Sequence, residues 1–175
     1  MSRKRPDLKP GHRVVLADHV RPIPFHGGKP AVSHDTILFV SSVTGHGSAR
    51  NPFRVTTTNG THTWHHDATD VRKVGEWTCI ACGEPTHPVD KPGETDCNNL
   101  CRSRGLTFQV PPPPMFVVAF DDDPFRGSPV SLVEFLADNA DGWDGEVSDL
   151  VRLKPGEVYT CGGGASPVAK IARVS

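Results

Sequence analysis

The first part of the chain alternates short apolar runs with turn-forming residues. One apolar run covers 14–17, shortly after a Pro-Gly turn, and a second covers 37–40. A stronger signal is the Asn-Gly pair that starts at Asn59, between two arms rich in β-branched and aromatic residues. Because Asn-Gly favours a two-residue hairpin turn, residues 53–66 are predicted to form a β-hairpin. With a short closing strand over 71–74, this part of the chain is predicted to be all-β.

The hairpin register predicts which side chains belong to the core. A two-residue turn pairs Thr58 with Thr61 and therefore places Val55 opposite Trp64. Side chains alternate between the two faces of a strand, so Val55, Trp64 and Phe53 share one face. These three residues are predicted to be buried, and the polar opposite face is predicted to meet water.

The last third of the chain mixes helical and strand patterns. Ser131 and Glu134 fit a capping box that opens a short helix. Apolar residues at helical spacing predict a second helix over 145–153. Two predicted strands, over 157–161 and 168–174, are joined by a glycine-rich loop. This part of the chain is therefore predicted to be an α+β module.

Four cysteines in the middle of the chain have the spacing of a zinc site. Two residues separate Cys79 from Cys82, and three separate Cys97 from Cys101. The first pair forms a tight knuckle, and the second completes the four-thiolate shell of a structural zinc ion. A filled shell leaves no open position for a substrate, so one structural Zn²⁺ is predicted rather than a catalytic one. The alternatives are four reduced thiols without metal, and a shell in which His87 replaces one cysteine.

The cysteine segment resembles a treble-clef zinc finger, in which a helix after the knuckle carries the second pair of ligands. The run from Cys97 to Cys101 is similar to the Cys-Asn-x-Cys run of GATA-type fingers, with one residue inserted. The basic tail of those fingers is missing from this chain. The resemblance therefore implies a zinc role for the four cysteines and implies no contacts to DNA bases.

Composition favours several small modules over one large core. The apolar fraction is 36%, and the chain contains 17 Gly and 17 Pro. Four consecutive prolines at 111–114 form a stiff spacer that continues neither a strand nor a helix. The predicted fold class is β-rich α+β. It comprises a small N-terminal β-barrel over 1–75, a central zinc knuckle over 76–110, and a Pro-rich spacer with a C-terminal α+β module over 111–175.

The N-terminal segment carries a further resemblance. Residues 9–74 start with Lys-Pro-Gly-x-Arg-Val and end with Asp-Val-Arg-x-Val, around short strands and a polar hairpin. This pattern resembles the small Src-homology-three-like barrels of the Tudor and KOW kind, which bind nucleic acid, peptides or other proteins. The Gly- and Pro-rich composition with a lone zinc knuckle resembles the accessory proteins of bacteriophages of actinobacteria.

A net charge of −1 hides an asymmetry along the chain. Residues 1–75 carry 11 Lys and Arg against 5 Asp and Glu, whereas residues 111–175 carry 5 against 10. One interpretation is two solvated surfaces of opposite sign, and the other is a basic, His-rich module that faces a polyanion. The residues predicted to contact nucleic acid are Arg3, Lys4, Arg5, Arg13, Arg54, Arg72 and Lys73.

The predicted function is that of a zinc-stabilised binding or adaptor protein, because no complete catalytic constellation is visible and no enzyme is expected. Its expected partner is DNA or RNA, or a nucleic-acid-associated complex. One alternative is a regulator or inhibitor that binds a host protein through the acidic segment 121–149. The other is a metal-dependent hydrolase that uses His62 and His66. With no signal peptide and no membrane span in the sequence, a cytoplasmic location without membrane contact is expected.

Overall fold

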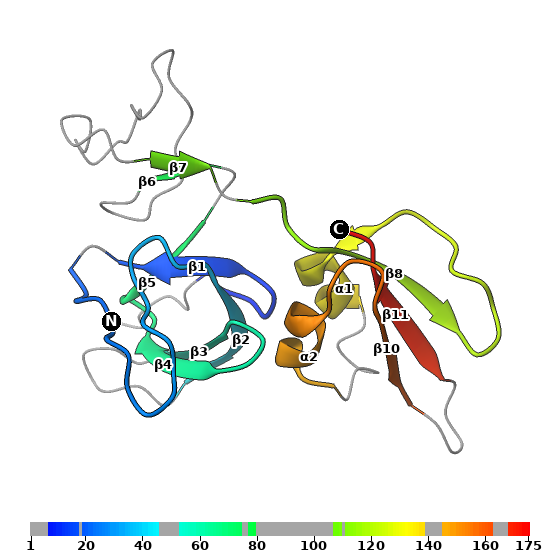
Figure 1. The fold of residues 1–175 in the computed structure, drawn as a ribbon, viewed down its shortest axis with the longest axis horizontal. Coiled ribbons are helices and arrows are strands. Elements are labelled where there is room, and N and C mark those ends of the chain that lie inside the picture. The colour runs from blue at the N-terminus through cyan, green and yellow to red at the C-terminus, as the bar shows by residue number, and fades with distance from the viewer. Residues whose placement is uncertain are drawn as a thin grey trace, which may run out of the picture.

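The computed structural model describes residues 7–17, 19–45, 53–74, 77–79, 107–109, 111–138, 145–162 and 168–175, with the backbone alone at 77–79 and 107–109. Two antiparallel sheets hold nine of the strands, and two short helices lie between the sheets (Figure 1). A separate ladder joins β6 (Trp77–Cys79) to β7 (Thr107–Gln109). The protein is therefore β-rich with an α+β organisation, as the sequence predicts.

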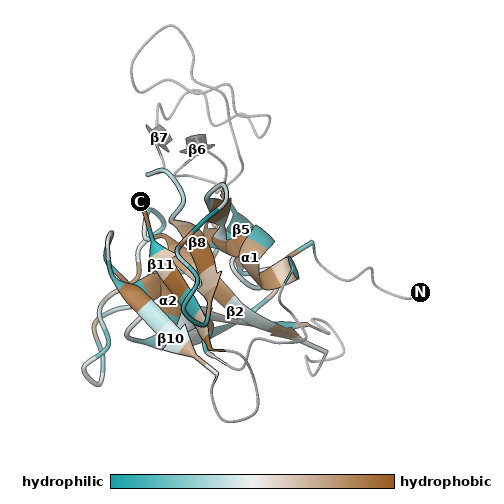
Figure 2. Ribbon diagram, turned by 90° about the vertical axis from the view of Figure 1, so that its right-hand side faces the viewer, coloured by the Kyte–Doolittle hydropathy of each residue, from teal (hydrophilic) through white to brown (hydrophobic). Residues whose placement is uncertain are grey.

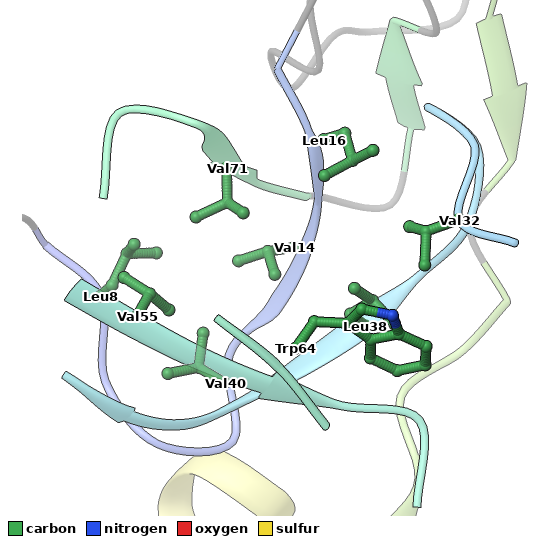
Figure 3. Packing of buried hydrophobic residues seen from close by; sticks show 9 residues of the cluster. All are labelled: Leu8, Val14, Leu16, Val32, Leu38, Val40, Val55, Trp64 and Val71. Atoms are coloured by element: carbon green, nitrogen blue, oxygen red, sulfur yellow. The ribbon is translucent and has the colours of Figure 1, made fainter. Parts of the chain in front are cut away.

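The first sheet has five strands in the order β4-β3-β2-β1-β5, so the last strand pairs with the first. Its strands are β1 (Arg13–Leu16), β2 (Leu38–Thr44), β3 (Arg54–Thr58), β4 (Thr63–Asp67) and β5 (Val71–Lys73). Their inward side chains form one apolar core, in which Trp64 packs near Leu38 and Val32 (Figure 3). Val14 and Val55 lie in the same core and are fully buried. Within the described residues the sheet is not a closed barrel.

The β3–β4 register differs from the predicted one by two residues. Thr58 pairs with Thr63, and Thr57 rather than Val55 lies opposite Trp64. The cause is Asn59, whose side-chain oxygen accepts hydrogen bonds from the amides of Thr61 and His62 at 3.0 and 2.8 Å and so stabilises a longer loop. A shift of two preserves the faces, because side chains alternate with a period of two.

Burial in the hairpin follows that preserved alternation. Val55 and Trp64 are buried, which confirms their predicted core positions, whereas Phe53 is half-buried. The prediction that the polar face meets water is wrong at Thr58, which is fully buried. Its hydroxyl accepts a hydrogen bond from the amide of Gly60 inside the turn, so the burial leaves the hydroxyl paired.

The second sheet has four strands in the order β10-β11-β8-β9. Its elements are β8 (Met115–Phe120), β9 (Val130–Ser131), β10 (Val158–Cys161) and β11 (Ala169–Arg173), with the helices α1 (Leu132–Asp138) and α2 (Val147–Arg152). Hydrophobic residues run along β8 and β11 (Figure 2). Phe116 and Ile171 pack against Leu150 of α2 and are fully buried. The predicted helices and the two predicted C-terminal strands are confirmed within two residues.

Both helices start at reciprocal caps. The predicted capping box is present: the Ser131 amide donates to Glu134 Oε2 at 2.8 Å, and the Glu134 amide donates to Ser131 Oγ at 3.3 Å. Bonds from the Ser131 amide and hydroxyl hold the pKa of Glu134 below its ordinary value, because they favour the ionised carboxylate. Glu146 and Asp149 form the corresponding box at α2.

The two sheets meet through the helices. Phe39, on the outward face of β2, packs against the core of the second sheet. Two glycines with positive φ allow close approach of the backbones at this junction. A Cβ atom at Gly11 would lie 3.0 Å from the backbone nitrogen of Val133, and one at Gly60 would lie 3.0 Å from that of Arg152. The junction is therefore a packed interface between the first sheet and α1 and α2.

Gly11→Ala should destabilise the protein more than Gly28→Ala does. Both glycines have positive φ, +85° and +79°, but nothing lies within 4 Å of a Cβ at Gly28. The control thus carries the backbone strain alone, about 1–2 kcal/mol. Gly11→Ala adds a clash with the backbone of α1, which we expect to raise its cost by about 1–3 kcal/mol. Urea denaturation measures both values, and equal losses would show that the close approach contributes nothing.

Candidate functional site

The structure brings three of the predicted nucleic-acid-binding residues onto neighbouring strands. Arg13 lies on β1, and Arg72 and Lys73 lie on the adjacent edge strand β5. By the β1–β5 register, Arg72 is opposite Val15 and shares a face with Arg13. Arg54, on β3, lies two strands from β1 and is not part of this group. The other three predicted residues, Arg3, Lys4 and Arg5, lie outside the described residues.

A small cavity of about 200 Å³ opens where β1 and β5 meet the start of α1. We call this cavity the basic notch, because His12, Arg13 and Lys73 line its first-sheet side. Prolines of the spacer and residues 131–133 line the opposite side. With Phe39 of β2, the cavity thus draws on five separate segments of the chain, which meet at the junction of the two sheets.

Arg13 joins the two sides of the basic notch. Its guanidinium donates a hydrogen bond to the backbone carbonyl of Pro111, the first residue of the spacer. Burial lowers the pKa of Arg13 because it disfavours the charged form. The guanidinium carries five N–H donors, and among the described residues Pro111 is its one hydrogen-bond partner. Donors therefore remain for an anion at this site.

The pKa of His12 is lowered both by burial and by the positive charge around the basic notch. Its side chain is nearly buried, and its Nδ1 accepts a hydrogen bond from the Lys9 amide at 3.0 Å. The pKa of His12 is lowered first by burial and then by the positive charges of Lys73 and Lys9, with Asp7 acting in the opposite direction. Lys73 and Asp7 approach to 3.9 Å, and both are exposed. Two lysines thus act on His12 against one carboxylate, and with Arg13 on the same cavity the local excess of positive charge suits an anion.

A second and larger cavity, of about 640 Å³, lies between β2–β4 of the first sheet and the helices. We call it the junction pocket. Its sheet side carries the hydroxyl residues Ser41, Thr56 and Thr63, and Ser41 is the extra residue where the β2–β3 register shifts. Such bulges are frequent beside functional sites. Val133 lines both this pocket and the basic notch.

The predicted His cluster is split between the core and the surface. His66 is buried, with its Nε2 3.0 Å from Thr57 Oγ1, whereas His65 is exposed. His62 lies in the turn, with its ring centroid 6.1 Å from that of Trp64. In the part of the chain that the structure describes, no group of three or more His, Cys, Asp or Glu is arranged to hold a metal ion.

His66 should make the protein less stable in acid. Burial lowers its pKa, which Asp70 opposes and His65 reinforces. The unfolded chain therefore takes up a proton first, so stability is full above about pH 6.5 and is lost as the pH falls from there towards the folded-state pKa.

Replacing His66 tests this dependence. His66→Gln retains a hydrogen-bonding partner for Thr57. In this variant the urea midpoint should fall less between about pH 7.5 and pH 5 than it does in the parent protein. His26→Gln, at an exposed loop position, should keep the pH dependence of the parent. An unchanged profile in His66→Gln would assign the acid sensitivity to other groups.

The predicted zinc ligands lie largely outside the described residues. Cys79 is the last residue of β6 and pairs with Thr107 of β7, and nothing is described of its side chain. Cys82, Cys97 and Cys101 lie beyond the described ranges. The fifth cysteine, Cys161, lies at the end of β10 and packs against the second core.

Comparison with known protein families, with curated proteins and with solved structures found no match to the chain. In the described residues, no helix combines the length and the apolar character needed to cross a membrane. Sequence reasoning identified Arg13 and Lys73 from charge alone, and it did not single out His12 or the junction pocket. Only contacts between distant segments mark these two features.

Proposed function

We propose that the protein is a zinc-stabilised binding protein that contacts the phosphate backbone of nucleic acid through the basic notch. The observation that carries this proposal is the convergence of Arg13, Lys73 and His12 on one cavity with an excess of positive charge. Guanidinium and ammonium groups are the usual partners of nucleic-acid phosphates. A concave site of about 200 Å³ accommodates a phosphate group rather than a large ligand.

The form of the first sheet supports a small barrel of the Src-homology-three-like kind as part of this proposal. The order β4-β3-β2-β1-β5 returns the closing strand to the side of β1. That arrangement brings Lys73, at the end of the closing strand, close to the His12–Arg13 segment. We propose that this barrel presents a binding surface in an adaptor role and that the protein has no enzymatic activity.

A structural zinc ion bound by Cys79, Cys82, Cys97 and Cys101 is the second part of the proposal. The β6–β7 ladder supports it, because it sets position 79 beside position 107 and so closes the base of the cysteine segment. β6 also begins four residues after β5, so the proposed zinc module is attached directly to a strand of the basic notch. Thiolate ligation requires reduced cysteines, which fits the proposed cytoplasmic location.

Salt dependence of binding tests the proposed function. We expect the logarithm of the affinity for an oligonucleotide to fall linearly with the logarithm of the salt concentration. Lys73→Gln removes one phosphate contact, so the slope should become shallower by about 0.7–0.9. Lys154→Gln removes the same charge from an exposed position on the second sheet's side and should leave the slope unchanged. Fluorescence anisotropy measures both, and equal slopes for the two variants would exclude the basic notch.

A further inference from the structure

The junction pocket has two chemically different walls. Hydroxyl residues from three neighbouring strands line the sheet side. Apolar residues of the helices line the other side, namely Val133, Leu136, Ala137 and Val147. A volume of about 640 Å³ lies within the range of sites that hold small organic ligands. A flat heterocycle fits both walls, because its faces are apolar and its edges carry hydrogen-bond donors and acceptors.

The hydroxyl wall offers groups that are available for hydrogen bonding. Thr56 Oγ1 already pairs with His65 Nδ1 at 3.1 Å. The hydroxyls of Ser41 and Thr63 bond no other described residue and lie on the same wall. Ser41 stands at the bulge of β2, outside the regular pairing with β3. Two uncommitted hydroxyls therefore face a cavity whose other wall is apolar.

One carboxylate and one cation line the pocket. Glu146 lines the pocket, but its carboxylate accepts a hydrogen bond from Ser148 at 3.0 Å and takes part in the cap of α2. Lys9 lines the same pocket and forms no ion pair with any described residue. Lys9 also contributes to the positive potential at His12, which lines the basic notch. Positive charge thus extends from the notch to the mouth of the pocket.

We infer that the junction pocket receives an unpaired nucleobase while a neighbouring phosphate of the same strand occupies the basic notch. This inference rests on the proposed function and adds to it a preference for single-stranded nucleic acid. The two cavities share Val133, and their lining residues Pro10 and Gly11 are consecutive, so one strand spans both. A base in a duplex is stacked and paired and does not enter such a pocket without being flipped out.

Three probes of equal length test the preference in the full-length protein. They are a single-stranded oligonucleotide, the same strand in a perfect duplex, and a strand of abasic sites with the same sugar–phosphate backbone. One accommodated base should strengthen binding of the single strand by about tenfold over the abasic strand. Lys73→Gln should weaken binding of all three probes, because each presents phosphate.

Filling the pocket should remove the preference without removing the backbone contact. Ala137 is exposed and lines the pocket, so Ala137→Trp should bring single-strand affinity down to the abasic level. Ala31→Trp makes the same change at an exposed loop position and should have no effect. Thr63→Val, at a strand position, should also weaken binding of the single strand and of no other probe. Because this substitution is small, it shows whether the effect of Ala137→Trp comes from loss of the base contact or from misfolding.

The outcomes distinguish the two proposals. Equal affinity for the single strand and the abasic strand, with Lys73→Gln still weakening both, would overturn the nucleobase inference and leave the proposed function standing. Tighter binding of the duplex, or a gain of single-strand affinity in Ala137→Trp, would overturn it as well. Absence of binding to every probe at low salt would overturn the proposed function and the inference with it.

Discussion

Cys79→Ser and Cys97→Ser are each expected to release one zinc ion per chain and to unfold the ladder of β6 and β7. Each substitution removes one thiolate from a four-ligand shell. Zinc binding in small modules of this kind supplies roughly 10–16 kcal/mol of apparent free energy at neutral pH, and much of it is folding free energy. A ladder of two three-residue strands has little stability of its own. Metal analysis of the purified protein, with circular dichroism of the variants, measures both effects.

Cys161→Ser is the matched control for these variants. Cys161 lies in β10 and packs against the second core, so its replacement should leave the metal content unchanged. The first sheet should also persist when a chelator removes the metal, because its core contains no cysteine. Hydrogen exchange should then remain slow at Val14 and become fast at Thr78. Protein that is purified without chelator and contains no zinc would contradict the proposed metal site.

Local patterns in the sequence account for most of the elements of this fold. The capping box at Ser131 and Glu134 depends on residues three apart, and it forms as predicted. The alternation along β3 and β4 buries Val55 and Trp64, although the register itself is shifted. A register shift of two residues leaves each side chain on the same face of the strand, whereas the register itself depends on the hydrogen bonds that Asn59 forms within the loop. Face prediction was therefore more robust than pairing prediction.

The candidate site was harder to predict because no single segment contains it. The spacing of charges suggested Arg13 and Lys73, but the cavity between them requires the spacer prolines and the start of α1. Gly11 reads as part of a turn in the sequence, and its close approach to Val133 becomes apparent only in the folded chain. Contacts between residues more than a hundred positions apart leave no periodic signal along the chain. The junction, and with it both cavities, is a property of tertiary packing.

Phe116→Ala is expected to cost about 3–5 kcal/mol and to unfold the second sheet together with its helices. The Phe116 side chain is fully buried at the centre of the second core, where replacement by alanine removes its contacts and leaves a cavity. A loss of this size is a large fraction of the stability of a small domain. Phe120 lies on the same strand and the same face but is 51% exposed, so Phe120→Ala should cost much less.

The same variant tests whether the two sheets unfold together. Phe39 of β2 packs against the core that holds Phe116, and both interface glycines contact the helices. If this junction couples the two sheets, Phe116→Ala should lower the urea midpoint of the first sheet as well, reported by the fluorescence of Trp64 in a background where Trp77 and Trp143 are replaced by Phe. An unchanged transition at Trp64, beside early loss of the second sheet, would show two independent units. In that case the basic notch would open before the first sheet unfolds, and Phe116→Ala would weaken nucleic-acid binding while the first sheet stays folded.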